Sequence, residues 1–191
     1  MSCINKLTAA VTYDCTNVAN RAKSGLESKA VLINKSDIDL TSLVQSGATV
    51  TTMLLTSGKT GYDVSWIKQL GSVGAEFSVN DGFDTFQQNF ACRVFGQGRG
   101  DSQLIKELAE GEFVVVVETK YKGAANVDSY KVFGLENGLK MSEGSFTSLE
   151  NDGSFLFTLA SLEGYGERYP YQIYAGASYS AATAKFNANF A

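Results

Sequence analysis

Short runs of Val, Thr, Phe and Tyr, bounded by Gly, Asn, Asp and Ser, recur along this chain of 191 residues. Runs with these boundaries are typical of antiparallel β-strands that are joined by tight turns. Three of them occupy residues 29–34, 49–55 and 76–79. The pattern predicts a mainly β protein with strands at these three places.

A stricter alternation runs from residue 86 to residue 94, because Phe86, Phe90, Cys92 and Val94 fall on one face and polar side chains on the other. This period of two predicts a half-buried strand.

An apolar stripe at helical spacing follows this strand: Leu104, Ile105, Leu108 and Ala109. It predicts one short helix over about residues 102–110, which Gly111 ends. Asp101 or Ser102 is the expected cap. A β-branched run then predicts a strand over residues 113–121, with its first half buried on both faces.

Three further strand-like segments cover residues 130–135, 139–149 and 154–160. The turns between them contain Asn137-Gly138 and Asn151-Asp152-Gly153, and such pairs suit the positive φ angles of tight hairpins. Two successive hairpins are therefore expected.

The chain length suits a single domain over residues 1–191, with an extended N-terminal segment at about 1–28 and a C-terminal arm at about 176–191. Phe186 and Phe190 would be unusual in a solvated tail, since exposed large apolar groups mark contact surfaces. The alternative is a last strand or helix that packs on the protein's own core.

Two aromatic residues stand in a loop expected at residues 56–72. Tyr62 and Trp66 are of the type that anchors interfaces, although Trp66 suits a core position equally well. Together with Phe186 and Phe190, they form the expected set of subunit-interface residues.

The charge and the missing histidine limit the chemistry. Lys and Arg number 16 against 20 Asp and Glu, so the net charge of −4 has the wrong sign for tight nonspecific binding of phosphates. The chain has no histidine, the usual general base of Ser and Cys triads and the commonest zinc ligand. We expect no enzyme, no catalytic or metal-binding residues and no cofactor.

The three cysteines, Cys3, Cys15 and Cys92, match no zinc or redox spacing and are expected to be reduced. No apolar run approaches the length of about 20 residues that a membrane helix needs, so no membrane partner is expected. Arg99-Gly100-Asp101 matches a cell-adhesion tripeptide, but a turn and a helix cap explain it locally.

Over about residues 1–160, an ordered series of elements resembles virion proteins of tailed phages that infect gut Bacteroidetes, including crAss-like phages. The elements are Cys3 with Tyr13–Cys15, Ala30–Ile38, Leu108–Glu118, Val132–Leu139 and Phe155–Leu159.

This resemblance implies a fold of the tail-tube type, an antiparallel β-sandwich or barrel with one short helix. It also implies assembly of copies into a ring of the tail tube or of the head-to-tail connector (the neck). The implied partners are further copies, other virion proteins and double-stranded DNA that passes through the ring. The implied location is the virion, after synthesis in the bacterial cytoplasm.

The expected mechanism is assembly, with exposed strand edges pairing between subunits. Loop 56–72 and the segment 176–191 are the expected contacts between rings. The main alternative is a β-sandwich that binds carbohydrate or a receptor, as a virion decoration or an adhesin. A glycosidase that uses carboxylates alone is also compatible with the absence of histidine.

Overall fold

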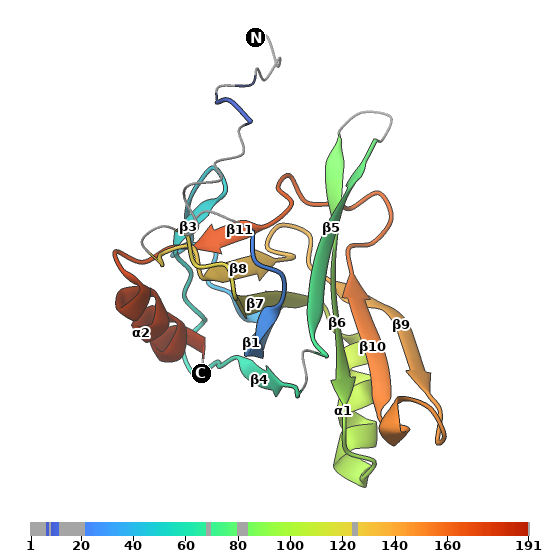
Figure 1. Cartoon of the computed structure of the whole chain (residues 1–191). Helices are drawn as coiled ribbons and strands as arrows, with labels where there is room; N and C mark the ends of the chain where they lie inside the picture. Colours follow the sequence, from blue (N-terminus) through green and yellow to red (C-terminus); the bar gives the residue numbers. More distant parts are fainter. Residues whose placement is uncertain are drawn as a thin grey trace.

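The computed structural model describes residues 7, 9–11, 22–67, 70–79, 84–123 and 126–190. Over these residues the chain is mainly β, as expected, and its strands form two sheets that pack face to face (Figure 1). The sheets keep free edges, so the architecture is a sandwich and not a closed barrel.

The larger sheet has seven strands and is called the large sheet below. All neighbours are antiparallel except β3 and β11, which are parallel. In spatial order its strands are β2 (Val44–Ser46), β3 (Thr49–Thr52), β11 (Gln172–Tyr174), β8 (Tyr130–Phe133), β7 (Phe113–Thr119), β1 (Leu26–Asn34) and β4 (Tyr62–Ser65).

The second sheet, called the small sheet below, is antiparallel throughout. In spatial order its strands are β5 (Ser72–Ser78), β6 (Thr85–Val94), β10 (Phe155–Ala160) and β9 (Lys140–Phe146). Helix α1 (Arg99–Glu110) links the two sheets, α2 (Tyr179–Phe190) follows β11, and short 3-10 turns occupy Lys35–Asp37 and Asn151–Gly153.

Strand β7 carries the two hydrophobic cores on its two faces. Val115 and Val117 face the small sheet, whereas Val114 and Val116 belong to the core beneath α2. Residues 113–117 are all buried, which confirms the predicted strand and its burial on both faces. A run without polar residues is what such a doubly covered strand requires.

Helix α1 confirms the predicted helix, although it begins three residues earlier. Asp101 lies inside the first turn, and its carboxylate accepts a hydrogen bond of 2.8 Å from the N–H of Gly98. This bond satisfies a main-chain donor that the start of a helix otherwise leaves free. Leu108 is buried, and Ile105 packs against the same core, as the apolar stripe predicted.

The C-terminal residues form a second helix where an arm was expected. Ala182, Phe186 and Phe190 recur every fourth residue, and all three are buried against the large sheet. The ring of Phe186 stacks on Tyr130 with centroids 4.8 Å apart. Over these residues, the alternative of packing on the protein's own core is therefore what the structure has.

The expected hairpin between residues 130–135 and 139–149 is wrong, whereas the second hairpin, β9–β10, is confirmed. Strand β8 belongs to the large sheet and β9 to the small sheet. The chain does turn at Gly138, with φ of +77°. However, Leu139 then exchanges both main-chain hydrogen bonds with Phe113, and the chain continues into the other sheet.

Other expectations differ in their bounds. The strand expected at 49–55 ends at Thr52, the one at 76–79 lies within β5 and its continuation, and loop 56–72 contains β4. Most of the expected N-terminal segment, with Cys3 and Cys15, lies outside the described residues. Within the described part of the chain, no helix is long and apolar enough to cross a membrane.

Removal of the Phe186 ring should destabilise the fold, because the ring fills the core between α2 and β8. Phe186→Ala is expected to lower the free energy of unfolding by about 3–5 kcal/mol, as measured by urea denaturation. Asn187→Ala, on the exposed side of the same helix, is the control and should change stability little. Equal stability of the two variants would contradict this packing.

Candidate functional site

Both outer strands of the small sheet, β5 and β9, are seven residues long. Among the described residues neither has a second strand neighbour. Soluble proteins usually protect such edges with charges, proline or a covering segment, because free main-chain groups invite another strand. Strand β5 contains no proline and only one charged residue, Glu76.

The alternation of main-chain hydrogen bonds along a strand identifies the groups of β5 that face outward. The N–H of Ser161 donates to the C=O of Gln88 at 2.9 Å, on the β10 side of β6. Main-chain groups of a strand alternate between its two neighbours, so the odd-numbered residues of β6 bond to β5. Their partners are the even-numbered residues of β5. Val73, Ala75 and Phe77 therefore direct their N–H and C=O groups away from the sheet.

The β5–β6 hairpin also carries exposed apolar side chains. Phe77 contacts Phe86, with centroids 5.5 Å apart, and is 59% exposed. Val79 is 77% exposed. In Figure 1 this hairpin extends beyond the large sheet. The β5 edge thus combines free main-chain groups with apolar surface.

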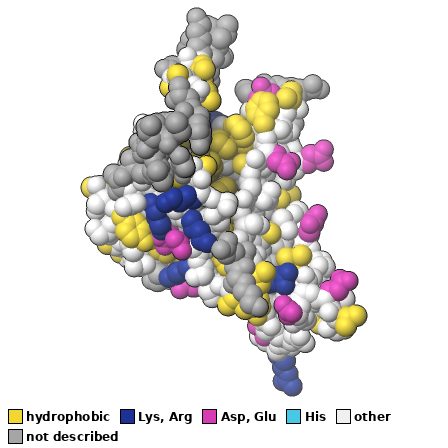
Figure 2. All heavy atoms as spheres, in the orientation of Figure 1, with side chains coloured by type: hydrophobic (Ala, Val, Ile, Leu, Met, Phe, Trp, Pro, Cys, Tyr) yellow, Lys and Arg dark blue, Asp and Glu magenta, His cyan; other side chains and the backbone are white. Residues whose placement is uncertain are grey.

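The outer face of the small sheet, which neither the large sheet nor α1 covers, is polar and mostly uncharged. Small or neutral side chains dominate it, and its charged members are Glu76, Glu143, Arg93 and Lys140. The amine of Lys140 forms an ion pair with Glu112 at 3.4 Å. Figure 2 shows carboxylates scattered over the side of the molecule that this sheet occupies. By register, the face comprises Ser72, Gly74, Glu76, Ser78, Thr85, Gln87, Asn89, Ala91, Arg93, Lys140, Glu143, Ser145, Leu156, Thr158 and Ala160.

Of the four expected interface residues, only Tyr62 lies at the surface, with 56% of its area exposed. Trp66 is buried between the sheets, 6.2 Å from the ring of Phe90. Phe186 and Phe190 are buried beneath α2. The role of Tyr62 at an interface stays a prediction, and the other three side chains are inside this subunit.

A cavity of about 520 Å³ lies between β4, the end of β6 and α1. Core residues form its floor, and polar residues line it as well. The floor comprises Leu32, Val94, Leu108, Phe113 and Phe157, and the polar lining residues include Asn34, Asp63, Arg93 and Glu107. This volume is within the usual range of ligand sites, about 300–1,000 Å³.

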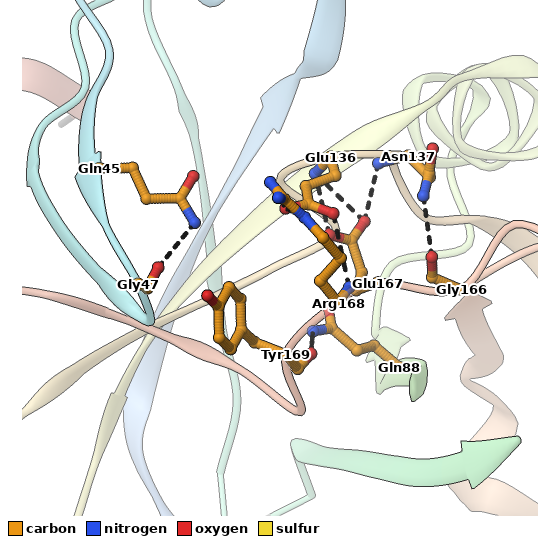
Figure 3. Close-up of polar contacts among 9 residues, drawn as sticks. All are labelled: Gln45, Gly47, Gln88, Glu136, Asn137, Gly166, Glu167, Arg168 and Tyr169. Carbon is orange, nitrogen blue, oxygen red and sulfur yellow. Dashed lines mark hydrogen bonds and ion pairs between the residues drawn. The ribbon is translucent and has the colours of Figure 1, made fainter. Parts of the chain in front are cut away.

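A buried carboxylate fixes the segment that leads from β10 to β11 (Figure 3). Glu167 has no exposed surface, and its oxygens accept hydrogen bonds from the N–H groups of Asn137 (2.8 Å) and Glu136 (2.9 Å). Arg168 forms an ion pair with Glu136 at 2.5 Å. Burial raises the pKa of Glu167. The network holds the segment before β11 against the turn between β8 and β9, where the chain passes from the large sheet to the small sheet.

Gln88 supports the same turn from inside the small sheet. Its side chain accepts a hydrogen bond from the N–H of Gly134 at 2.6 Å and donates one to the C=O of Tyr169 at 2.8 Å. Sequence reasoning missed both Gln88 and Glu167. One signal was available in the sequence: Gln88 alternates with Phe86 and Phe90, so it is a polar residue on the apolar face of its strand.

The side chains of Glu167 and Gln88 thus hydrogen-bond to main-chain groups. Among the residues that the structure describes, no group of three Cys, Asp or Glu side chains could hold a metal ion. Cys92 is a free, buried thiol, and burial raises its pKa.

This chain matches no protein-family model, no curated protein and no solved structure. Its function is therefore inferred from sequence and geometry.

Glu167→Gln should change the pH dependence of stability. The pKa of Glu167 is raised above its ordinary value of 4.5, so the folded state retains a proton that the unfolded state has lost. The stability that this residue contributes is complete below pH 4.5 and falls as the pH rises through the raised pKa. The difference in unfolding free energy between the wild type and the variant should decline over this window in urea titrations.

Glu112→Gln is expected to show the opposite dependence. A hydrogen bond from Lys35, at 2.7 Å, and the nearby Lys140 lower the pKa of Glu112. Its contribution is therefore present above pH 4.5 and disappears as the pH falls through the lowered pKa. Profiles that change in the same direction for the two variants would contradict one of the two assignments.

Proposed function

We propose that this chain is a non-enzymatic structural subunit that assembles with further copies into a ring, through the two free edges of its small sheet. The observation that carries the proposal is that β5 and β9 are equally long, face opposite ways and have different sequences. An interface between two different edges is heterologous, and such contacts close into rings when the rotation between copies permits.

Edge pairing also determines which side of the sheet lines the ring. The large sheet, α1 and α2 all lie on one side of the small sheet, and this bulk does not fit inside a narrow channel. The outer face therefore points to the lumen. It presents small, neutral side chains with Glu76, Glu143, Arg93 and Lys140, and the amine of Lys140 is paired with Glu112. Such a surface gives phosphates little to bind.

Together with the resemblance to virion proteins of tailed phages, this geometry supports a ring of the tail tube or of the neck. Double-stranded DNA would pass through it during ejection of the genome, and the other partners would be neighbouring virion proteins. The acidic balance of the chain, −4 overall, suits passage and not retention.

Ala75→Pro tests the β5 edge, because it removes an outward-facing N–H and leaves the bonds to β6 in place. We expect wild-type rings with a central hole in negative-stain electron microscopy, and monomers for the variant at equal concentration. Ser65→Pro, a proline at an outward position of β4 in the large sheet, is the matched control and should still form rings. A wild-type chain that stays monomeric at every concentration, or Ala75→Pro rings, would contradict the proposal.

The lumen assignment predicts a gain of DNA binding. Glu76→Lys combined with Glu143→Lys raises the net charge from −4 to 0 and places cations inside the ring. These rings should retain double-stranded DNA in a gel-shift assay, with affinity that falls steeply as salt rises. Glu107→Lys with Glu110→Lys makes the same charge change on α1, away from the lumen, and equal retention by that control would contradict the assignment.

A further inference from the structure

The cavity beside α1 is bordered by a free strand edge that the proposed ring does not use. Tyr62, Asp63, Val64 and Ser65 all line it, and four consecutive residues of a strand do so only when its edge faces the space. Strand β4 has one strand neighbour, β1, among the described residues. Main-chain groups of β4 therefore border the cavity directly.

The same alternation shows which main-chain groups of β4 do not bond to β1. The N–H of Trp66 donates to the C=O of Ser28 in β1 at 3.3 Å. In this antiparallel register Val64 and Tyr62 also bond to β1. Asp63 and Ser65 consequently direct their N–H and C=O groups outward, and no described residue bonds to them.

The opposite walls favour one apolar side chain. Leu32, Phe113 and Phe157 form part of a floor that continues into the core between the sheets. On α1, Leu104 and Leu108 lie one helical turn apart along the side of the cavity, and Leu104 is 45% exposed. An apolar side chain inserted against this floor and these two leucines meets an apolar surface, and polar residues such as Arg93 and Glu107 line the rest of the cavity.

We propose that this cavity binds an extended polypeptide segment, which adds to β4 as a further strand and inserts one apolar side chain between β4 and α1. The outward main-chain groups of Asp63 and Ser65 are two residues apart, which is the spacing at which a neighbouring strand forms its hydrogen bonds. Peptide recognition by strand addition uses this geometry. A small ligand would fill the apolar floor but would not pair with the regularly spaced groups of Asp63 and Ser65. The site is separate from the ring edges, and its occupation does not depend on ring formation.

Selection from a phage-displayed library of random linear peptides against the wild-type protein tests this site. Enriched peptides should share one apolar residue among β-formers. On binding, the amides of Asp63 and Ser65 should become protected from hydrogen exchange, whereas those of Tyr62 and Val64 are protected already.

Two variants locate the binding. Ser65→Pro removes one outward N–H and should weaken the selected peptides about tenfold, and Leu104→Glu should weaken them by placing a charge at the cavity wall. Ala75→Pro, which targets the ring edge, should leave binding unchanged. The proposal is overturned if no peptide is enriched, or if enriched peptides bind both cavity variants as well as the wild type. Neither result bears on ring assembly, which microscopy measures independently.

Discussion

Burial of β1 and β7 on both faces is the constraint on which the rest of the molecule depends. Each strand needs an apolar cover on two sides, so the fold requires three layers: α2, the large sheet and the small sheet. Main-chain hydrogen bonds in such a centre have no competing water, and their strands need neighbours on both edges. The strands with an unpaired edge consequently lie at the periphery, and among the described residues they are β2, β4, β5 and β9.

The second requirement is that the chain change sheets without leaving polar groups unpaired. At one such change, over residues 134–138, Gln88 and Glu167 supply buried acceptors for main-chain N–H groups. A buried carboxylate is costly, and its raised pKa reflects that cost. The hydrogen bonds that it accepts offset part of the cost and determine the path of the chain between the layers.

The local pattern of apolar and polar residues was sufficient to predict the elements in which burial follows a regular period. The run at 113–117, the alternation at 86–94 and the apolar stripe of α1 each carry a clear period. The pairing of β8 was missed because a tight Asn-Gly turn predicts a hairpin, whereas the contacts of Leu139 with Phe113 are nonlocal. The segment of helix α2 was left open between an arm and a strand or helix that packs on the core, because its many small residues are compatible with each of these. The free edges themselves could not be predicted, because they follow from which strands are neighbours.

The parallel pair of β3 and β11 links the order of synthesis to the completion of the fold. Strand β3 ends at Thr52, but its neighbour in the large sheet begins at Gln172, about 120 residues later on the ribosome. Until β11 and α2 have emerged, the core residues beneath α2 remain uncovered and β3 lacks one partner. A nascent or prematurely terminated chain therefore exposes apolar surface that chaperones and proteases recognise. Burial of the core beneath α2 therefore depends on synthesis of the chain through Phe190.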